Sequence, residues 1–147
     1  TSSADFETIT SKELSHTNRN WWVTIWQTGW GTHPDGALAL RTSSGGSVAC
    51  DLSTTGRLDD SNWHFFAVQT SASVANIYVD GEFNATQANP GIPDTPNTSV
   101  LIGAGKNGAS PRREFDGYID AVTIYSRLLT AQEILDMYND SKDDYLD

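Results

Sequence analysis

The stretch "EFDGYIDAVTIYSRLLTAQEILDMY", residues 114–138, changes its periodicity halfway along. The first half has the apolar content and spacing of a β-strand, which we predict over 117–126. The second half predicts a helix, because Thr130 is a natural N-cap and Glu133 stands three positions later, as in a capping box. A turn, a core strand that closes the fold and a capped helix are therefore expected in succession.

Six further segments before this stretch are rich in aromatic and β-branched residues and are separated by clusters of Gly, Pro, Asn, Asp and Ser. They lie at 20–28, 36–42, 46–53, 63–71, 74–81 and 98–105. Short strands separated by such turns indicate an all-β antiparallel sandwich or jelly roll with one short C-terminal helix. Apolar residues on both faces of 63–71 predict a central strand, and Asp80-Gly81 predicts a type I′ turn.

Composition narrows the class of protein. The 147 residues fit one domain, 1–147, and a net charge of −10 argues against nucleic acid and against an anionic membrane surface. No run is long and apolar enough to predict a membrane span. Low hydrophobic and charged contents, 37% and 19%, are typical of extracellular β-rich domains. The lone Cys50 excludes an intrachain disulfide, and its strand-like surroundings predict a small buried side chain.

Four segments occur in an order and spacing that resemble a known family: "LDDSNWHFFAV" (58–68), "NIYVDGE" (76–82), "LIGAG" (101–105) and "FDGYIDAVTIYSRLLTAQEI" (115–134). The chain resembles the laminin-G-like or concanavalin A-like jelly roll family, found in secreted lectins, adhesins and accessory domains of polysaccharide-degrading enzymes. The resemblance implies two further strands ahead of residue 1, so that the chain begins about thirty residues into the fold. Either those strands are supplied elsewhere, or "TSSADFETI" (1–9) forms one of them. A missing strand leaves an open sheet edge, which predicts self-association or pairing with another chain.

The resemblance makes catalysis a hypothesis to test. Glycoside hydrolases need two carboxylates about 5 to 9 Å apart, and hydrolases of this fold alternate them on one strand as E-x-D-x-x-E. Glu114, Asp116 and Asp120 approximate that run, but Tyr118 occupies the middle position. A lyase would need Arg, His and Tyr on the concave sheet, where only His64 is expected, as a hydrogen-bonded and half-buried residue. We therefore predict no catalytic residues.

Asp116 and Asp120 are also the candidate metal ligands. Calcium prefers several carboxylate and carbonyl oxygens, and in jelly rolls of this kind a structural calcium often bridges the sandwich rim near the closing strand. The resemblance places Asp120 there. In the alternative interpretation Asp116 caps the turn at Gly117 and Asp120 is a hydrogen-bonded residue at the end of a strand.

Carbohydrate binding is predicted for the tryptophan-rich segment "NRNWWVTIWQTGWGTHPDG", residues 18–36. Aromatic faces cover the C–H surfaces of sugars. Trp22 and Trp26 share one face of the predicted strand. Either that face is turned to solvent and binds sugar, or all the tryptophans pack inside the sandwich. Trp30 and His33 follow in the next loop, where the pattern does not require burial.

A second loop, 105–114, contains several positively charged residues, among them Arg112, and the amide side chain of Asn107. An acidic sugar would bind there, unless the loop is only solvated surface. The predicted ligand-binding residues are thus Trp22, Trp26, Trp30, His33, Asn107 and Arg112.

The resulting hypothesis is a non-catalytic module of a secreted or cell-surface protein that binds a glycan or extracellular matrix, with calcium as a candidate structural ion. Two others stay open: a structural or adhesion scaffold that binds protein, and an ancillary domain of a carbohydrate-active enzyme. Burial of Trp22 and Trp26 would favour the scaffold.

Overall fold

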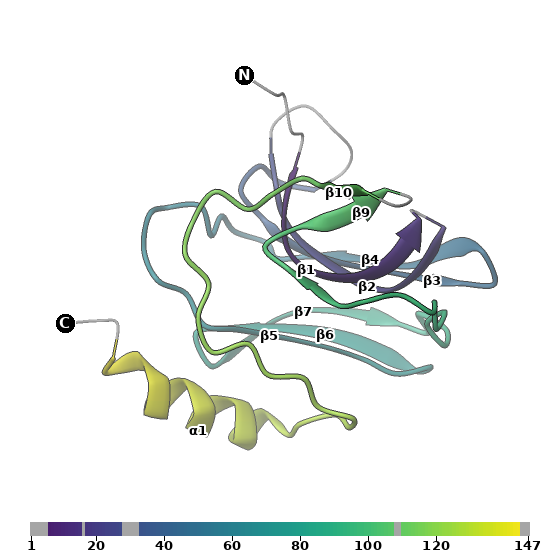
Figure 1. Cartoon of the computed structure of the whole chain (residues 1–147). Coiled ribbons are helices and arrows are strands. Elements are labelled where there is room, and N and C mark those ends of the chain that lie inside the picture. The colour runs from purple at the N-terminus through teal and green to yellow at the C-terminus, as the bar shows by residue number, and fades with distance from the viewer. Residues whose placement is uncertain (1–5, 16, 28–32, 108–109, 145–147) are drawn as a thin grey trace.

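The computed structural model describes residues 6–15, 17–27, 33–107 and 110–144. Two antiparallel sheets face each other as the layers of a β-sandwich, and one helix lies against the outside of the smaller sheet (Figure 1). This arrangement confirms the predicted all-β sandwich with a C-terminal helix.

The larger sheet has five strands in the order β4-β3-β2-β1-β8. They are β1 (Phe6–Ser15), β2 (Asn18–Trp26), β3 (Leu38–Ser44), β4 (Ser47–Ser53) and the short β8 (Leu101–Ile102). The first four form a meander, so that each strand pairs with the next one along the chain.

The smaller sheet has three strands in the order β5-β6-β7: β5 (Phe66–Thr70), β6 (Val74–Val79) and β7 (Glu82–Ala88). Asp80 and Gly81 join β6 to β7 with φ angles of 51° and 80°, which confirms the predicted type I′ turn. Glycine is also required at position 81 because a Cβ atom there would lie 2.8 Å from Cδ1 of Tyr138 in the helix.

The remaining elements cover the outer faces. Strands β9 (Gly105–Asn107) and β10 (Ser110–Arg112) form a hairpin on the outside of the five-stranded sheet, and α1 (Ala131–Lys142) lies along the three-stranded sheet (Figure 1). Among the described residues, no helix is long and apolar enough to cross a bilayer.

The core lies between the two sheets. Its buried residues are contributed by β1 to β4 on one side and by β6 on the other: Ile9, Val23, Ile25, Leu38, Leu40, Cys50, Leu52, Ala75 and Ile77. Burial raises the pKa of the Cys50 thiol to about 12, so the side chain is an uncharged apolar group, as expected.

The predicted closing strand over 117–126 is wrong. The chain between β10 and α1 contains no strand, and Tyr118 and Ile124 are 86% and 59% exposed. The two ends of this segment are bound to different sheets: the Phe115 N–H donates to the Gly103 carbonyl beyond β8, and the Leu129 N–H donates to the Gln69 side chain in β5. We call residues 113–130, between β10 and α1, the crossing segment, because they run from one sheet to the other (Figure 1). The crossing segment therefore does not lie beside a single strand.

The prediction of a central strand over 63–71 is wrong for the same reason. Strand β5 is an edge strand, since the segment that would have covered its outer side bridges the two sheets instead. Phe66 and Val68 still pack against the core with one face.

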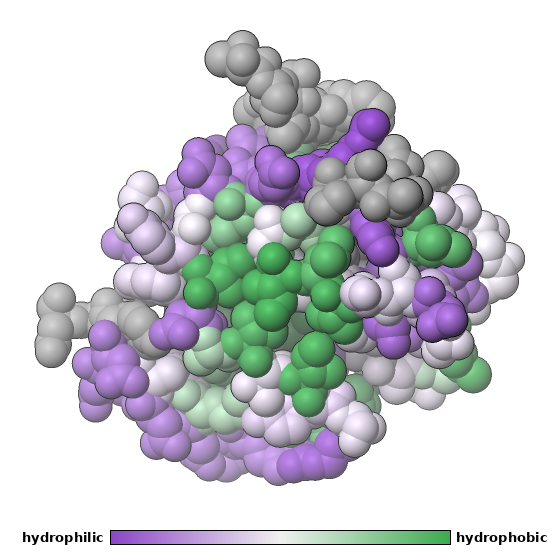
Figure 2. Space-filling model, in the orientation of Figure 1, coloured by the Kyte–Doolittle hydropathy of each residue, from purple (hydrophilic) through white to green (hydrophobic). Residues whose placement is uncertain are grey.

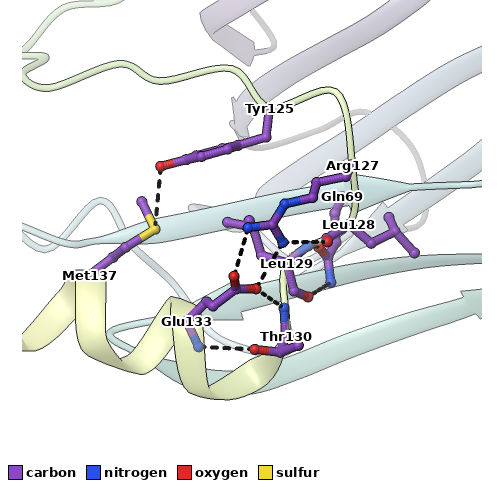
Figure 3. A network of polar contacts seen from close by, with 8 residues as sticks. All are labelled: Gln69, Tyr125, Arg127, Leu128, Leu129, Thr130, Glu133 and Met137. Carbon is purple, nitrogen blue, oxygen red and sulfur yellow. Dashed lines mark hydrogen bonds and ion pairs between the residues drawn. The ribbon is translucent and has the colours of Figure 1, made fainter.

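A polar network fixes the start of α1 (Figure 3). Thr130 Oγ1 accepts a hydrogen bond from the Glu133 N–H, and a Glu133 carboxylate oxygen accepts one from the Thr130 N–H, which confirms the predicted capping box. Arg127 pairs with the same carboxylate at 2.6 Å. The Gln69 side chain holds the Leu129 peptide through both an acceptor and a donor contact, so the cap is bound to β5.

We expect Thr130→Ala to lower the free energy of unfolding by about 1 kcal/mol, because the Glu133 N–H loses its acceptor at the helix start. Thr130→Ser keeps the hydroxyl and should stay close to wild type. Urea unfolding followed by tryptophan fluorescence measures both variants, and equal losses in the two would contradict the role of the cap.

Candidate functional site

Trp22 and Trp26 are on the outer face of the five-stranded sheet but are not exposed. Each is 2% exposed, and they form a second buried cluster with Phe6 and Ala39. Trp21, on the opposite face of β2, packs against the core between the sheets. The predicted division of the tryptophans between two faces is confirmed, whereas the accessible aromatic surface that sugar binding needs is absent from Trp22 and Trp26.

The β9–β10 hairpin covers the Trp22 ring, whereas Trp26 packs against Phe6, His33 and Arg41. A Cβ atom on Gly105 would lie 3.2 Å from Trp22 Nε1 and 2.9 Å from both Thr8 Oγ1 and Glu13 Oε1, so the hairpin backbone rests directly on this face. Glu13 accepts a hydrogen bond from the Lys106 N–H at 2.8 Å. Sequence reasoning had assigned 105–114 to an open loop.

Arginine side chains complete the buried outer layer. The centre of the Arg19 guanidinium lies 4.8 Å from the Trp22 ring centroid, that of Arg41 lies 4.6 Å from Trp26, and that of Arg113 lies 3.9 Å from Phe6. Arg19 is 2% exposed, and its burial lowers its pKa to about 10 although Glu13 opposes the shift. Cation–π contacts between desolvated groups stabilise such a layer. It forms an interior, and no sugar can reach its aromatic faces.

Of the other predicted ligand residues, His33 packs edge-on against Trp26, with ring centroids 4.9 Å apart, and Asn107 and Arg112 lie on the two strands of the β9–β10 hairpin. Trp30 lies outside the described residues. His33 is packed, with Nε2 2.7 Å from Asp51 Oδ1, and its side chain is 7% exposed. Asn107 belongs to β9, and Arg112, in β10, is exposed.

Asp116 and Asp120 are exposed residues of the segment that crosses between the sheets. Asp120 accepts a hydrogen bond from the Ala121 N–H at 2.7 Å. Across the described part of the chain, no three His, Cys, Asp or Glu side chains gather where they could hold a metal ion. Calcium binding stays a prediction, which a chelator-induced fall in the thermal midpoint would support and an unchanged midpoint would contradict.

Sequence reasoning missed a hollow of about 940 Å³ that opens between the two sheets on the side where β5 is the edge. Figure 2 shows apolar side chains gathered on this face around the opening. The apolar lining comes from both sheets and from the crossing segment, and includes Ile9, Trp21, Val23, Phe66, Val68 and Ile119. The hollow exists because the crossing segment does not pair with β5.

Two exposed aromatic residues stand at this hollow. Trp63 is 41% and Tyr118 is 86% exposed, and their ring centroids are 6.4 Å apart with an interplanar angle of 40°. Both belong to the lining, together with Asn62, Asp116 and Asp120. A sequence signal for Trp63 existed, because the polar run "LDDSN" before it indicates a turn and therefore a strand end.

His64 lies beside this pair, between two carboxylates. Its Nδ1 is 2.9 Å from Asp80 Oδ2, and its Nε2 is 3.0 Å from Asp60 Oδ1. Burial by itself would lower the pKa of His64, but the hydrogen bonds to Asp80 and Asp60 outweigh it and raise the pKa. The expected half-buried, hydrogen-bonded histidine is confirmed, and it holds the entry to β5 in place.

The raised pKa of His64 makes stability depend on pH. A group with a raised pKa in the folded state stabilises fully below its unfolded pKa, about 6.5 for histidine, and that stabilisation is lost as pH rises through the folded value. We expect the thermal midpoint to fall between about pH 6 and pH 8 in wild type and to fall less in Asp80→Asn. An NMR titration should show a lower His64 pKa in Asp80→Asn, and an unchanged pKa would contradict the pairing.

Comparison with protein-family models agrees with this architecture. A family model described as the concanavalin A-like lectin/glucanases superfamily matches residues 2–135. A search of curated proteins finds no match. A crystal structure of an S-layer domain-containing protein (residues 221–444) from Clostridium thermocellum is similar to the chain, with 18% sequence identity and a TM-score of 0.47. The alignment covers 94% of this chain and 65% of that one. With a sandwich of two antiparallel sheets and a family match over most of its length, the chain belongs to the concanavalin A-like lectin/glucanase superfamily.

Proposed function

We propose that the domain is a non-catalytic recognition module that binds carbohydrate at Trp63 and Tyr118. The observation that carries the proposal is this exposed aromatic pair at the mouth of the hollow. Two rings inclined at 40° form a shallow platform on which the C–H face of a sugar ring can stack. Aromatic side chains that are apolar on their faces and accessible to water suit such ligands.

Polar side chains around the platform supply hydrogen bonds to hydroxyl groups. Asn62 is exposed and offers both a donor and an acceptor, and Asp116 and Asp120 offer acceptors. A few polar groups beside an apolar surface are the usual composition of a small-ligand site. The burial of Trp22 and Trp26 favours the scaffold alternative over sugar binding at those two residues, so we place the proposed carbohydrate site on a different set of residues.

The carboxylates near the platform favour binding over hydrolysis. A glycosidase needs one carboxylic acid with a raised pKa to protonate the leaving group. Here hydrogen bonds from Asn62 and His64 lower the pKa of Asp60 to about 2, and Asp80 holds both His64 and the Phe65 N–H. Glu114, Asp116 and Asp120 are not on a strand, so the alternation that would align them is missing.

We propose a secreted or cell-surface location for the protein that carries this domain. The low hydrophobic content of 37%, the net charge of −10 and the abundance of Ser, Thr and Asn support it, since such surfaces suit exposure to the extracellular medium. The family contains lectins, as its description says.

A glycan array tests the proposal with three proteins: wild type, Trp63→Ala and Phe83→Ala. We expect wild type to bind at least one glycan class, and Trp63→Ala to bind it about tenfold more weakly, because removal of a stacking ring removes about 1.4 kcal/mol. Phe83 is the matched control, since it is also exposed, at 57%, but is not part of the lining. No glycan bound by any of the three proteins would refute carbohydrate recognition.

A further inference from the structure

Strand β5 has one unused edge, and its register shows which backbone groups lie there. The Asp80 N–H donates to the Phe65 carbonyl, and the Ser71 N–H donates to the Val74 carbonyl, so the odd-numbered residues of this stretch bond to β6. Hydrogen bonding alternates along an antiparallel strand. The N–H and C=O groups of Phe66, Val68 and Thr70 therefore point to the open edge, where no described residue pairs with β5 as a strand.

The space beside that edge is the hollow between the sheets. Phe66 and Val68 line it from β5, Ile9 and Trp21 line it from the five-stranded sheet, and the crossing segment forms its outer wall. In that wall Val122 and Ile124 are 41% and 59% exposed. A volume of about 940 Å³ is far larger than a packing defect, and an unpaired edge beside it adds a row of hydrogen-bonding groups to the apolar walls.

The charged groups of the lining have mostly one sign. Asp80 is paired with His64, and Lys142 is the one lysine among the described lining residues. Against it stand five further carboxylates, while Asp59 is paired with Arg57 at 2.7 Å. The five are Glu7, Asp116, Asp120, Asp140 and Asp144. A ligand with positive charges at its ends is therefore complementary to this site.

We propose that the hollow binds a polypeptide segment in β conformation, which adds to the β5 edge as a further strand of the three-stranded sheet. The partner is a segment of another protein with alternating apolar residues and lysine or arginine at its ends. Apolar side chains fill the hollow, the backbone bonds to Phe66, Val68 and Thr70, and the basic ends meet the carboxylates. A partner strand of about five residues matches β5, which spans Phe66–Thr70.

Charge and geometry favour this occupant over the two simplest alternatives. A second copy of the chain carries the same net charge of −10, which opposes approach to an acidic site. A small apolar molecule would fill the volume but leave the row of backbone groups on β5 unpaired. The proposal goes beyond carbohydrate recognition, since it needs neither Trp63 nor Tyr118 to bind a sugar.

The probe is a fluorescent ten-residue peptide in which valine alternates with threonine between paired lysines at both ends. We expect saturable binding by fluorescence anisotropy, weakened about tenfold when glutamates replace the lysines. A proline at the central valine should abolish binding, because proline has no N–H and interrupts strand pairing. Equal binding of the proline peptide would overturn strand addition.

Two variants locate the site. Ile124→Arg places a cation in the wall of the hollow and should weaken binding about tenfold. Because Ile124 is 59% exposed, the substitution leaves the buried core unchanged. Ile102→Arg makes the same change at a residue that is 57% exposed and outside the lining, and should bind as wild type does. Equal loss in both variants, or in neither, would contradict the assignment of the site.

Amide hydrogen exchange by NMR reads the register directly. In the complex, the amides of Phe66 and Val68 should exchange about tenfold more slowly, while those of Ala67 and Gln69, already bonded to β6, should change little. Sedimentation of the protein alone is measured in parallel, and a dimer that Ile124→Arg disrupts would identify a second copy as the occupant and refute the basic peptide. The glycan array uses a separate readout, so failure of either proposal is recognised independently of the other.

Discussion

An extended backbone is stable as a strand only where neighbouring chains take up its N–H and C=O groups, and this constraint organises the whole molecule. In the five-stranded sheet it is met by a meander in which β1 to β4 pair in chain order. In the three-stranded sheet it is met on one side of β5 only. The segment 117–126 has a strand-like sequence but spans the gap between two sheets, because one end is bound beyond β8 and the other to Gln69.

That single missing pairing decides where the sandwich is open. A strand beside β5 would have closed the sandwich and left a continuous core. Without it the molecule has a hollow, lined by core-type side chains on the inside and by Trp63 and Tyr118 at its mouth. Both proposed activities come from this absence: the sugar platform uses the exposed aromatic rings, and the peptide site uses the unpaired backbone. Polar residues of the crossing segment serve both.

The tryptophan-rich strand β2 has a structural role in the described structure. One face of β2 contributes Val23 and Ile25 to the core, and the other contributes Trp22 and Trp26 to a second buried layer under the β9–β10 hairpin. Arginine guanidinium groups make cation–π contacts with the aromatic rings there. Glu13 forms an ion pair with Arg19 and so offsets its charge.

Structural features that depend on neighbouring residues could be predicted from the sequence alone. Apolar spacing and turn residues predicted strands β2, β3, β4, β5, β6 and β8, Asp80-Gly81 predicted the type I′ turn, and Thr130 with Glu133 predicted the helix start. Each depends on residues close together in the chain, so the physical preference is local. Strand β7 and the β9–β10 hairpin were not among the predicted strands. The family resemblance, which rested on segments in sequence order, also held over residues 2–135.

The tertiary structure decided what depends on distant neighbours. The path of the chain between the two sheets leaves 117–126 unpaired and makes β5 an edge strand. The position of the β9–β10 hairpin places Gly105 over Trp22. An apolar side chain has the same sequence signature whether it packs in a core or lines an open hollow. The sequence by itself therefore determined most of the strands, the helix and the class of fold, whereas the tertiary structure alone decided which surfaces stay open, because burial is set by contacts between segments far apart in the chain.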